Sequence, residues 1–145
     1  HDGFIINADA WDDEFYKYDY IGAPWPYVEG QFLDPFDNMH RVGNGGFSLR
    51  SKKLLEVSNQ EYIPCVETTH GKYYKHDGSG YFAEDVVICI HNAHIYEKYG
   101  CVFAPYEVAC RFARECTVDP NLQKNTFGVH GPMRVWIPEY DYNKT

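Results

Sequence analysis

The stretch that decides the fold is rich in glycine and runs Arg41-Val42-Gly43-Asn44-Gly45-Gly46-Phe47-Ser48-Leu49-Arg50-Ser51. Three glycines and an asparagine in four positions predict a loop that takes left-handed backbone angles and approaches a ligand closely. The alternation of Phe47 and Leu49 predicts a short strand, and Ser51 predicts the cap of a helix over 52–60. Loop, strand and helix in this order are typical of a ligand site in α/β enzymes. A tight turn between two strands is the alternative interpretation.

The overall composition indicates a globular chain. Its 145 residues are 44% hydrophobic and 23% charged, which are ordinary values for a folded domain, and we expect residues 1–145 to form a single domain. The net charge of −8 repels phosphate backbones, and the sequence has no basic patch, so nucleic acid is not an expected partner. No apolar run approaches the ~20 residues that a membrane span needs.

The five cysteines lack the paired spacing of metal ligands. They are Cys65, Cys89, Cys101, Cys110 and Cys116. An odd number of cysteines scattered among helix-like segments indicates reduced thiols. We therefore expect a cytoplasmic protein.

Acidic residues open two predicted helices. Asp9 is expected to cap a short helix over 9–15, with further acids in its first turn. Glu84 and Asp85 open a longer apolar segment whose periodicity predicts a helix to residue 99. An acid at a helix start that faces a cleft makes a good general base, although stabilisation of the helix end also explains both acids.

Short strands are expected at 1–7, at 101–104 and at 126–132, and a further strand is expected to end at Tyr20 and Ile21, because Gly22 and two prolines follow. Pro105 is well placed as the first residue of a helix. His130 stands at the end of the last predicted strand, which is a common place for a functional side chain.

Trp25 stands between two prolines and is therefore held rigidly. It can serve as a platform for stacking on a sugar ring, or it can be a buried anchor. At the start of the sequence, His1 and Asp2 predict either a metal site or a surface turn. An amino-terminal histidine can also bind copper through its amine and ring nitrogens, which would indicate oxidation of a polysaccharide.

Four segments together resemble a known family. They are Tyr18-Asp19-Tyr20-Ile21-Gly22-Ala23-Pro24-Trp25, the glycine-rich stretch over 42–51, Glu84-Asp85-Val86 and Phe127-Gly128-Val129-His130-Gly131. In this order and spacing they are similar to a glycosyltransferase-like family catalogued as a domain of unknown function, DUF5672, over about residues 1–132.

The resemblance implies the α/β fold of GT-A nucleotide-sugar glycosyltransferases, a mixed sheet flanked by helices, with the donor at the carboxyl ends of the strands. The chain resembles the C-terminal part of that fold. The nucleotide-binding half would then come from a preceding segment or from a partner chain. A degenerate form that keeps the acceptor half for another purpose is a further alternative.

The resemblance also implies a site. Mn²⁺ or Mg²⁺ would be held against the donor diphosphate by Asp2 and His130, with His1 in place of the usual first acid. Asp85 would be the general base that deprotonates the acceptor hydroxyl, and Glu84 its substitute. Residues from the glycine-rich stretch would shape the substrate pocket beside Trp25: Gly43, Asn44, Gly45 and Gly46.

The predicted function is the metal-assisted transfer of a sugar from a nucleotide-sugar donor to a glycan or other hydroxyl acceptor. The alternative is a non-catalytic carbohydrate-binding or assembly module derived from the same fold. The transferase prediction requires that the glycine-rich stretch, the pair Glu84 and Asp85, and His130 converge on one pocket large enough for a sugar.

Overall fold

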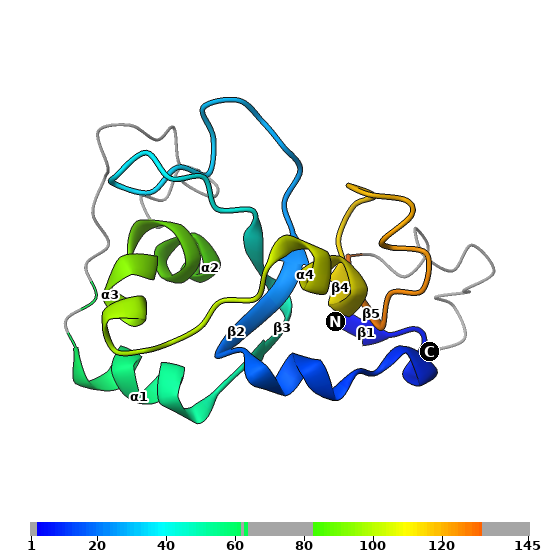
Figure 1. Ribbon diagram of the computed structural model, residues 1–145, viewed down its shortest axis with the longest axis horizontal. Coiled ribbons are helices and arrows are strands. Elements are labelled where there is room, and N and C mark those ends of the chain that lie inside the picture. Colours follow the sequence, from blue (N-terminus) through cyan, green and yellow to red (C-terminus); the bar gives the residue numbers. More distant parts are fainter. Residues whose placement is uncertain (1–2, 62, 64–82, 132–145) are drawn as a thin grey trace, which may run out of the picture.

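The computed structural model describes residues 3–61, 63 and 83–131 (Figure 1). Its elements are β1 (Gly3–Ile5), the 3₁₀ turns η1 (Ala8–Ala10) and η2 (Asp13–Lys17), β2 (Tyr20–Pro24), β3 (Val42–Arg50), α1 (Lys52–Gln60), α2 (Glu84–Val86), the π-helical segment η4 (Val87–His91), α3 (Ala93–Lys98), α4 (Tyr106–Phe112), β4 (Ala113–Arg114) and β5 (Gly128–His130).

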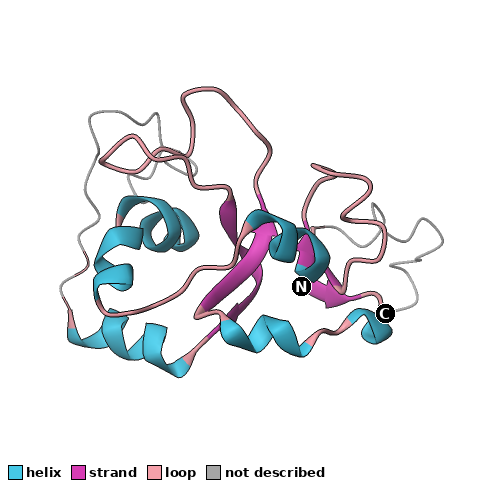
Figure 2. Cartoon of the chain, viewed as in Figure 1, coloured by secondary structure: helices cyan, strands magenta, loops and turns pink. Residues whose placement is uncertain are grey.

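The strands form two small sheets. In one, β2 and β3 are antiparallel. In the other, β5 lies between β1, with which it is antiparallel, and β4, with which it is parallel. Short helices surround the strands (Figure 2): α4 packs on β2, while α2 and η4 pack on β3. The predicted α/β class, with a mixed sheet and flanking helices, is confirmed.

Strand β2 separates two hydrophobic clusters because successive side chains of a strand point to opposite faces. Tyr20 packs in a cluster with Leu54 of α1 and Ile90 of η4. The next residue, Ile21, packs in a second cluster with Phe112 of α4. All five residues of β2 are buried, so this strand fixes the positions of the helices on both of its sides.

Helix α1 begins and ends where the sequence predicts. The Oγ of its cap, Ser51, accepts a hydrogen bond from the backbone nitrogen of Leu54 at 3.1 Å, as the cap preference requires. The same hydroxyl donates to Asp19 just before β2 at 2.5 Å, which ties the start of α1 to the central strand.

The glycine-rich stretch lies inside β3 and is not the loop that the sequence predicts. Gly22 pairs with Ser48, but the next residue, Ala23, pairs with Asn44, so residues 45–47 bulge out of the ladder. Positive φ angles occur at other glycines, Gly30, Gly100 and Gly131. The glycines of this stretch therefore allow close approach of neighbouring side chains: a Cβ on Gly43 would lie 2.5 Å from the Trp25 ring.

Four further local predictions are wrong in detail. The strand expected to end at Tyr20 and Ile21 instead begins at Tyr20 and continues to Pro24. Asp12, and not Asp9, caps the early turn η2, because its carboxylate accepts from the Glu14 nitrogen at 2.8 Å. Pro105 is the residue before α4 and not its first helical residue. The strand expected at 101–104 is reduced to a single parallel bridge between Phe103 and Tyr20.

The helix predicted from Glu84 is present but interrupted. Segment η4 has π-helical geometry, and Asn92 separates it from α3. Short π-helical segments within α-helices are often found at functional sites.

Within residues 3–61, 63 and 83–131, no helix has the length and apolar character that crossing a membrane requires. The cysteines in this part, Cys89, Cys101, Cys110 and Cys116, are free thiols. Cys65 lies outside the described residues.

Candidate active site

Most of the predicted site residues line one cavity of about 570 Å³. The lining residues come from the loop after β2, from β3, from α2 and the residue before it, from the loop after β4 and from β5: Trp25, Phe32, Asn44, Gly46, Ala83, Glu84, Asp85, Val86, Glu115 and His130. A volume of this size suits a small ligand. The predicted site residues Gly43 and Gly45 are not among the described lining residues, although each is next to one of them in β3.

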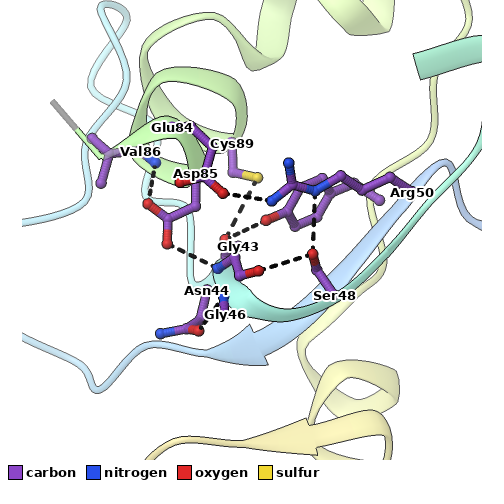
Figure 3. A network of polar contacts seen from close by, with 11 residues as sticks. Gly43, Asn44, Gly46, Ser48, Arg50, Glu84, Asp85, Val86 and Cys89 are labelled. Atoms are coloured by element: carbon purple, nitrogen blue, oxygen red, sulfur yellow. Dashed lines mark hydrogen bonds and ion pairs between the residues drawn. The ribbon is translucent and has the colours of Figure 1, made fainter. Parts of the chain in front are cut away.

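Asp85 joins α2 to the bulge of β3 (Figure 3). Its Oδ2 accepts a hydrogen bond from the Gly45 nitrogen at 2.9 Å, and its Oδ1 accepts one from the Val86 nitrogen at 2.8 Å. The bulge removes the Gly45 nitrogen from the strand ladder, and Asp85 supplies a hydrogen-bond partner for this half-buried donor.

Burial raises the pKa of the Asp85 carboxyl, and the charge of Glu84 adds to the rise, while the hydrogen bonds from Gly45 and Val86 oppose it. A carboxyl with a raised pKa holds a proton more readily than an ordinary aspartate does. That property suits a general base, which must accept a proton during the reaction.

Glu84 has a different environment from its neighbour. Burial alone would raise the pKa of its carboxyl, but the hydrogen bond and the charge of Arg50 outweigh that effect and hold the pKa below its ordinary value. Arg50 Nη2 lies 2.6 Å from Glu84 Oε1, and Arg50 Nε donates to Ser48 at 3.2 Å. The two adjacent acids are thus tuned in opposite directions, which favours Asp85 over Glu84 as the proton acceptor.

Glu115 forms the second polar wall of the cavity. Asn44 Nδ2 donates to Glu115 Oε2 at 2.6 Å, and His130 Nδ1 lies 3.2 Å from Glu115 Oε1. The Oδ1 of Asn44 in turn accepts from the Gly46 nitrogen in the bulge at 3.2 Å. One carboxylate therefore orients an amide and an imidazole toward the same bulge.

His130 packs directly against the glycine bulge. A Cβ placed on Gly46 would collide with the His130 ring, so the absence of a side chain at Gly46 is what lets the imidazole reach the cavity. In the sheet, His130 lies opposite Gly3.

Trp25 and Phe32 close the apolar side of the cavity. Their rings are parallel, with centroids 5.0 Å apart and an interplanar angle of 2°. Trp25 is only 7% exposed. Of its two predicted roles, this burial supports the buried anchor, although part of the ring still lines the cavity. Phe32 has a positive φ of 57°, an uncommon conformation for a bulky residue.

The sequence matches one known family over most of its length. Residues 1–130 match the family described as a protein of unknown function, DUF5672. The chain belongs to the DUF5672 family. The match includes every residue that lines the cavity, and it confirms the family named by the resemblance. Neither a curated protein nor a solved structure matches this DUF5672 chain.

In the described part of the DUF5672 chain, no group of three or more histidine, cysteine, aspartate or glutamate side chains is placed to hold a metal ion. His130 and Glu115 supply one imidazole and one carboxylate, a donor pair compatible with Mn²⁺. The predicted ligand Asp2 and the predicted copper ligand His1 lie outside the described residues. The metal site therefore stays a prediction.

Sequence reasoning missed Glu115 and Phe32. Glu115 follows β4 in a loop without a recognisable motif, and its contacts are with residues 71 and 15 positions away in the chain. No local signal points to such a residue. Phe32 stands in a segment that reads simply as a loop, and only its stacking on Trp25 places it at the cavity.

Proposed function

We propose that this DUF5672 protein is a GT-A-like glycosyltransferase that moves a sugar from a nucleotide-sugar donor to a hydroxyl group of a glycan or other acceptor. The observation that carries the proposal is the convergence of Asp85, Asn44 and His130 on one cavity of about 570 Å³. These residues come from three separate motifs, and the cavity has room for a sugar ring.

In the proposed reaction, the acceptor hydroxyl lies against Asp85. The carboxylate takes the hydroxyl proton while the acceptor oxygen bonds to the anomeric carbon of the donor sugar, and the bond from that carbon to the nucleotide diphosphate breaks. The raised pKa of Asp85 favours this proton transfer, and the bonds from Gly45 and Val86 hold the carboxylate in place before the acceptor arrives.

The proposal includes a divalent ion, Mn²⁺ or Mg²⁺, with Asp2 and His130 as its protein ligands. When bound, the ion would neutralise charge on the departing diphosphate. The proposal also includes a cytoplasmic location.

The test is nucleotide release. The protein is incubated with UDP- and GDP-sugars, Mn²⁺ and hydroxyl acceptors, and free nucleotide is measured over time. We expect release with one donor and a fall on the order of 10²-fold or more in Asp85→Asn, because general bases contribute that much. Glu107→Gln is the control, since Glu107 is exposed on α4 and does not line the cavity.

Two results would count against the proposal. Release from no donor, with or without Mn²⁺, argues against transfer altogether. If Asp85→Asn releases nucleotide at the wild-type rate, Asp85 is not the general base. A thermal melt of the variant separates loss of chemistry from loss of folding.

One observation favours the second candidate, a carbohydrate-binding or assembly module. Both oxygens of Asp85 already accept backbone hydrogen bonds, so this carboxylate has a structural task that needs no reaction. Binding of a glycan without turnover, unchanged by a chelator, would support the module.

A further inference from the structure

The backbone of Gly45 in the β3 bulge is held on two sides (Figure 3). Its nitrogen donates to Asp85 Oδ2 at 2.9 Å, and its carbonyl oxygen accepts a hydrogen bond from the Ser48 hydroxyl at 3.1 Å. One of these side chains comes from α2 and the other from β3 beyond the bulge. The conformation of the bulge and the position of the Asp85 carboxylate therefore depend on each other.

Arg50 connects the two side chains that hold Gly45. Its Nε donates to Ser48 Oγ at 3.2 Å, and its Nη2 donates to Glu84 Oε1 at 2.6 Å. Glu84 is the residue before Asp85 in the first turn of α2. One guanidinium group thus reaches Ser48 and, through Glu84, the turn that carries Asp85.

The guanidinium group of Arg50 is itself fixed by β2. Its central carbon lies 5.2 Å from the centroid of the Tyr20 ring, a favourable distance for a cation above an aromatic face. Tyr20 is fully buried, and its hydroxyl donates to the Gly43 carbonyl at 2.7 Å. A Cβ on Gly45 would collide with the Glu84 carboxylate and lie 2.9 Å from Arg50 Nη2. The ion pair therefore packs directly against the bulge.

We propose that Arg50 is a positioning residue for Asp85: its guanidinium group fixes the bulge and the first turn of α2 to each other, so that the carboxylate meets the acceptor in one orientation. This inference rests on the proposed function, in which Asp85 is the general base. Arginine is needed because its planar group presents separate nitrogens to Ser48 and to Glu84, whereas a lysine keeps the charge on a single nitrogen.

The charge of Arg50 acts on Asp85 as well. Arg50 opposes the rise in the pKa of the Asp85 carboxyl, and Glu84 adds to it. The Cys89 thiol and the Tyr20 hydroxyl also lie near Asp85, but burial raises the pKa of both groups, so they stay neutral at neutral pH. In the described part of the chain, Arg50 and Glu84 are thus the charges that face Asp85.

The experiment measures two properties by NMR, without donor, acceptor or metal: hydrogen exchange of the Gly45 amide and titration of the Asp85 carboxyl. In Arg50→Lys we expect exchange to rise on the order of tenfold, because the bulge is released, while the pKa of Asp85 stays close to the wild-type value. In Arg50→Gln exchange should rise equally, and the pKa should rise further because a positive charge is lost. Ser48→Ala should raise exchange alone.

Lys52→Gln is the matched control. It removes the positive charge of the exposed ion pair between Lys52 and Glu56 on α1, and it should leave both measurements unchanged. The pH profile of nucleotide release gives a readout that a purely structural role would not move: Arg50→Gln should shift its rising limb to higher pH, and Arg50→Lys should lower the rate without that shift. If Arg50→Gln does not fold, Arg50→Lys and Ser48→Ala decide the question.

The inference is overturned if Gly45 exchanges at the wild-type rate in Arg50→Lys, or if Arg50→Lys releases nucleotide at the wild-type rate although its exchange has risen. Failure of the proposed function gives a different result. If exchange and titration change as expected but no donor releases nucleotide, Arg50 still positions the Asp85 carboxylate and the transferase is rejected.

Discussion

The Asp85 carboxylate accepts a hydrogen bond from the backbone nitrogen of Gly45 at 2.9 Å, and this contact joins the first turn of α2 to the bulge in β3. The bond crosses 40 residues of sequence. It places the acid beside the strand that carries Asn44 and Gly46, so the bulge and the acid form one wall of the cavity.

The first prediction concerns the titration of Asp85. Because burial and the charge of Glu84 raise its pKa, its carboxyl should titrate above the ordinary aspartate value, and Glu84→Gln should lower that pKa by removing a like charge. Carbon-detected NMR of the side-chain carboxyl measures both. If Asp85 is the base, nucleotide release should rise with pH through the same pKa, since only the ionised form accepts a proton. Titration at or below the ordinary value would contradict the prediction.

The second prediction concerns the contact between Gly46 and His130. In Gly46→Ala the new methyl group collides with the imidazole. Because Gly46 is exposed and the colliding atoms are at the end of the His130 side chain, the ring can turn away, and we expect the free energy of unfolding to fall by about 1 kcal/mol, the cost of a displaced rotamer. In a His130→Ala background the same change should cost much less, because the ring is gone. Urea denaturation of the four proteins gives the coupling energy. Strictly additive effects would show that the two residues do not touch.

The third prediction concerns Asp34, which orders the loop that carries Phe32. Its carboxylate accepts from the Phe36 and Asn38 nitrogens, both at 2.8 Å, and lies 3.1 Å from His40 Nε2. Burial would raise its pKa, but the bonds from His40 and Asn38 outweigh that effect and lower the pKa to about 2. The side chain is 5% exposed, so these bonds are well shielded from water.

A lowered carboxyl pKa stabilises the fold at pH values above the ordinary aspartate pKa, and the gain disappears as the pH falls through about 4 toward 2. We expect Asp34→Asn to cost about 2 kcal/mol at neutral pH and to flatten the loss of stability in acid. The exposed Asp37→Asn is the matched control, because asparagine tolerates the positive φ of 65° at that position. Equal unfolding curves for the two variants in urea would refute the role of Asp34.

The fourth prediction concerns the metal. If Mn²⁺ or Mg²⁺ takes part, EDTA should abolish nucleotide release and added Mn²⁺ should restore it. Asp2→Ala and His130→Ala should each weaken Mn²⁺ binding by about tenfold or more. Calorimetric titration of the ion measures this without any need for turnover. Full activity in EDTA, or Mn²⁺ binding that neither variant changes, would remove the metal from the proposal.

Local signals gave good predictions wherever the neighbours in sequence decide the structure. The helix cap at Ser51 depends only on residues close in sequence, because its hydroxyl accepts a hydrogen bond from the backbone nitrogen three residues later. Helix α1 has the predicted bounds. The prediction that His130 lies at the end of a strand is also confirmed, since β5 ends at that residue. The resemblance supplied the grouping of Asp85, Asn44 and His130, and these residues do lie on one cavity.

The errors arose where partners distant in sequence decide the structure. Glycines permit both a loop and a bulged strand, and the choice depends on β2, which pairs with β3 on both sides of the bulge. Either Asp9 or Asp12 could cap an early turn by its residue type. Asp12 takes that role and also forms an ion pair with Arg111 of α4.

The sequence by itself determined the α/β class, the cap and length of α1, and membership of the DUF5672 family, because these follow from residue type and spacing along the chain. Only the tertiary structure decided that Glu115 joins Asn44 to His130 and that Asp85 and Glu84 differ in pKa. Hydrogen bonds, burial and charge depend on which side chains come within a few ångströms of each other, and the folded chain brings residues 40 to 71 positions apart into that range.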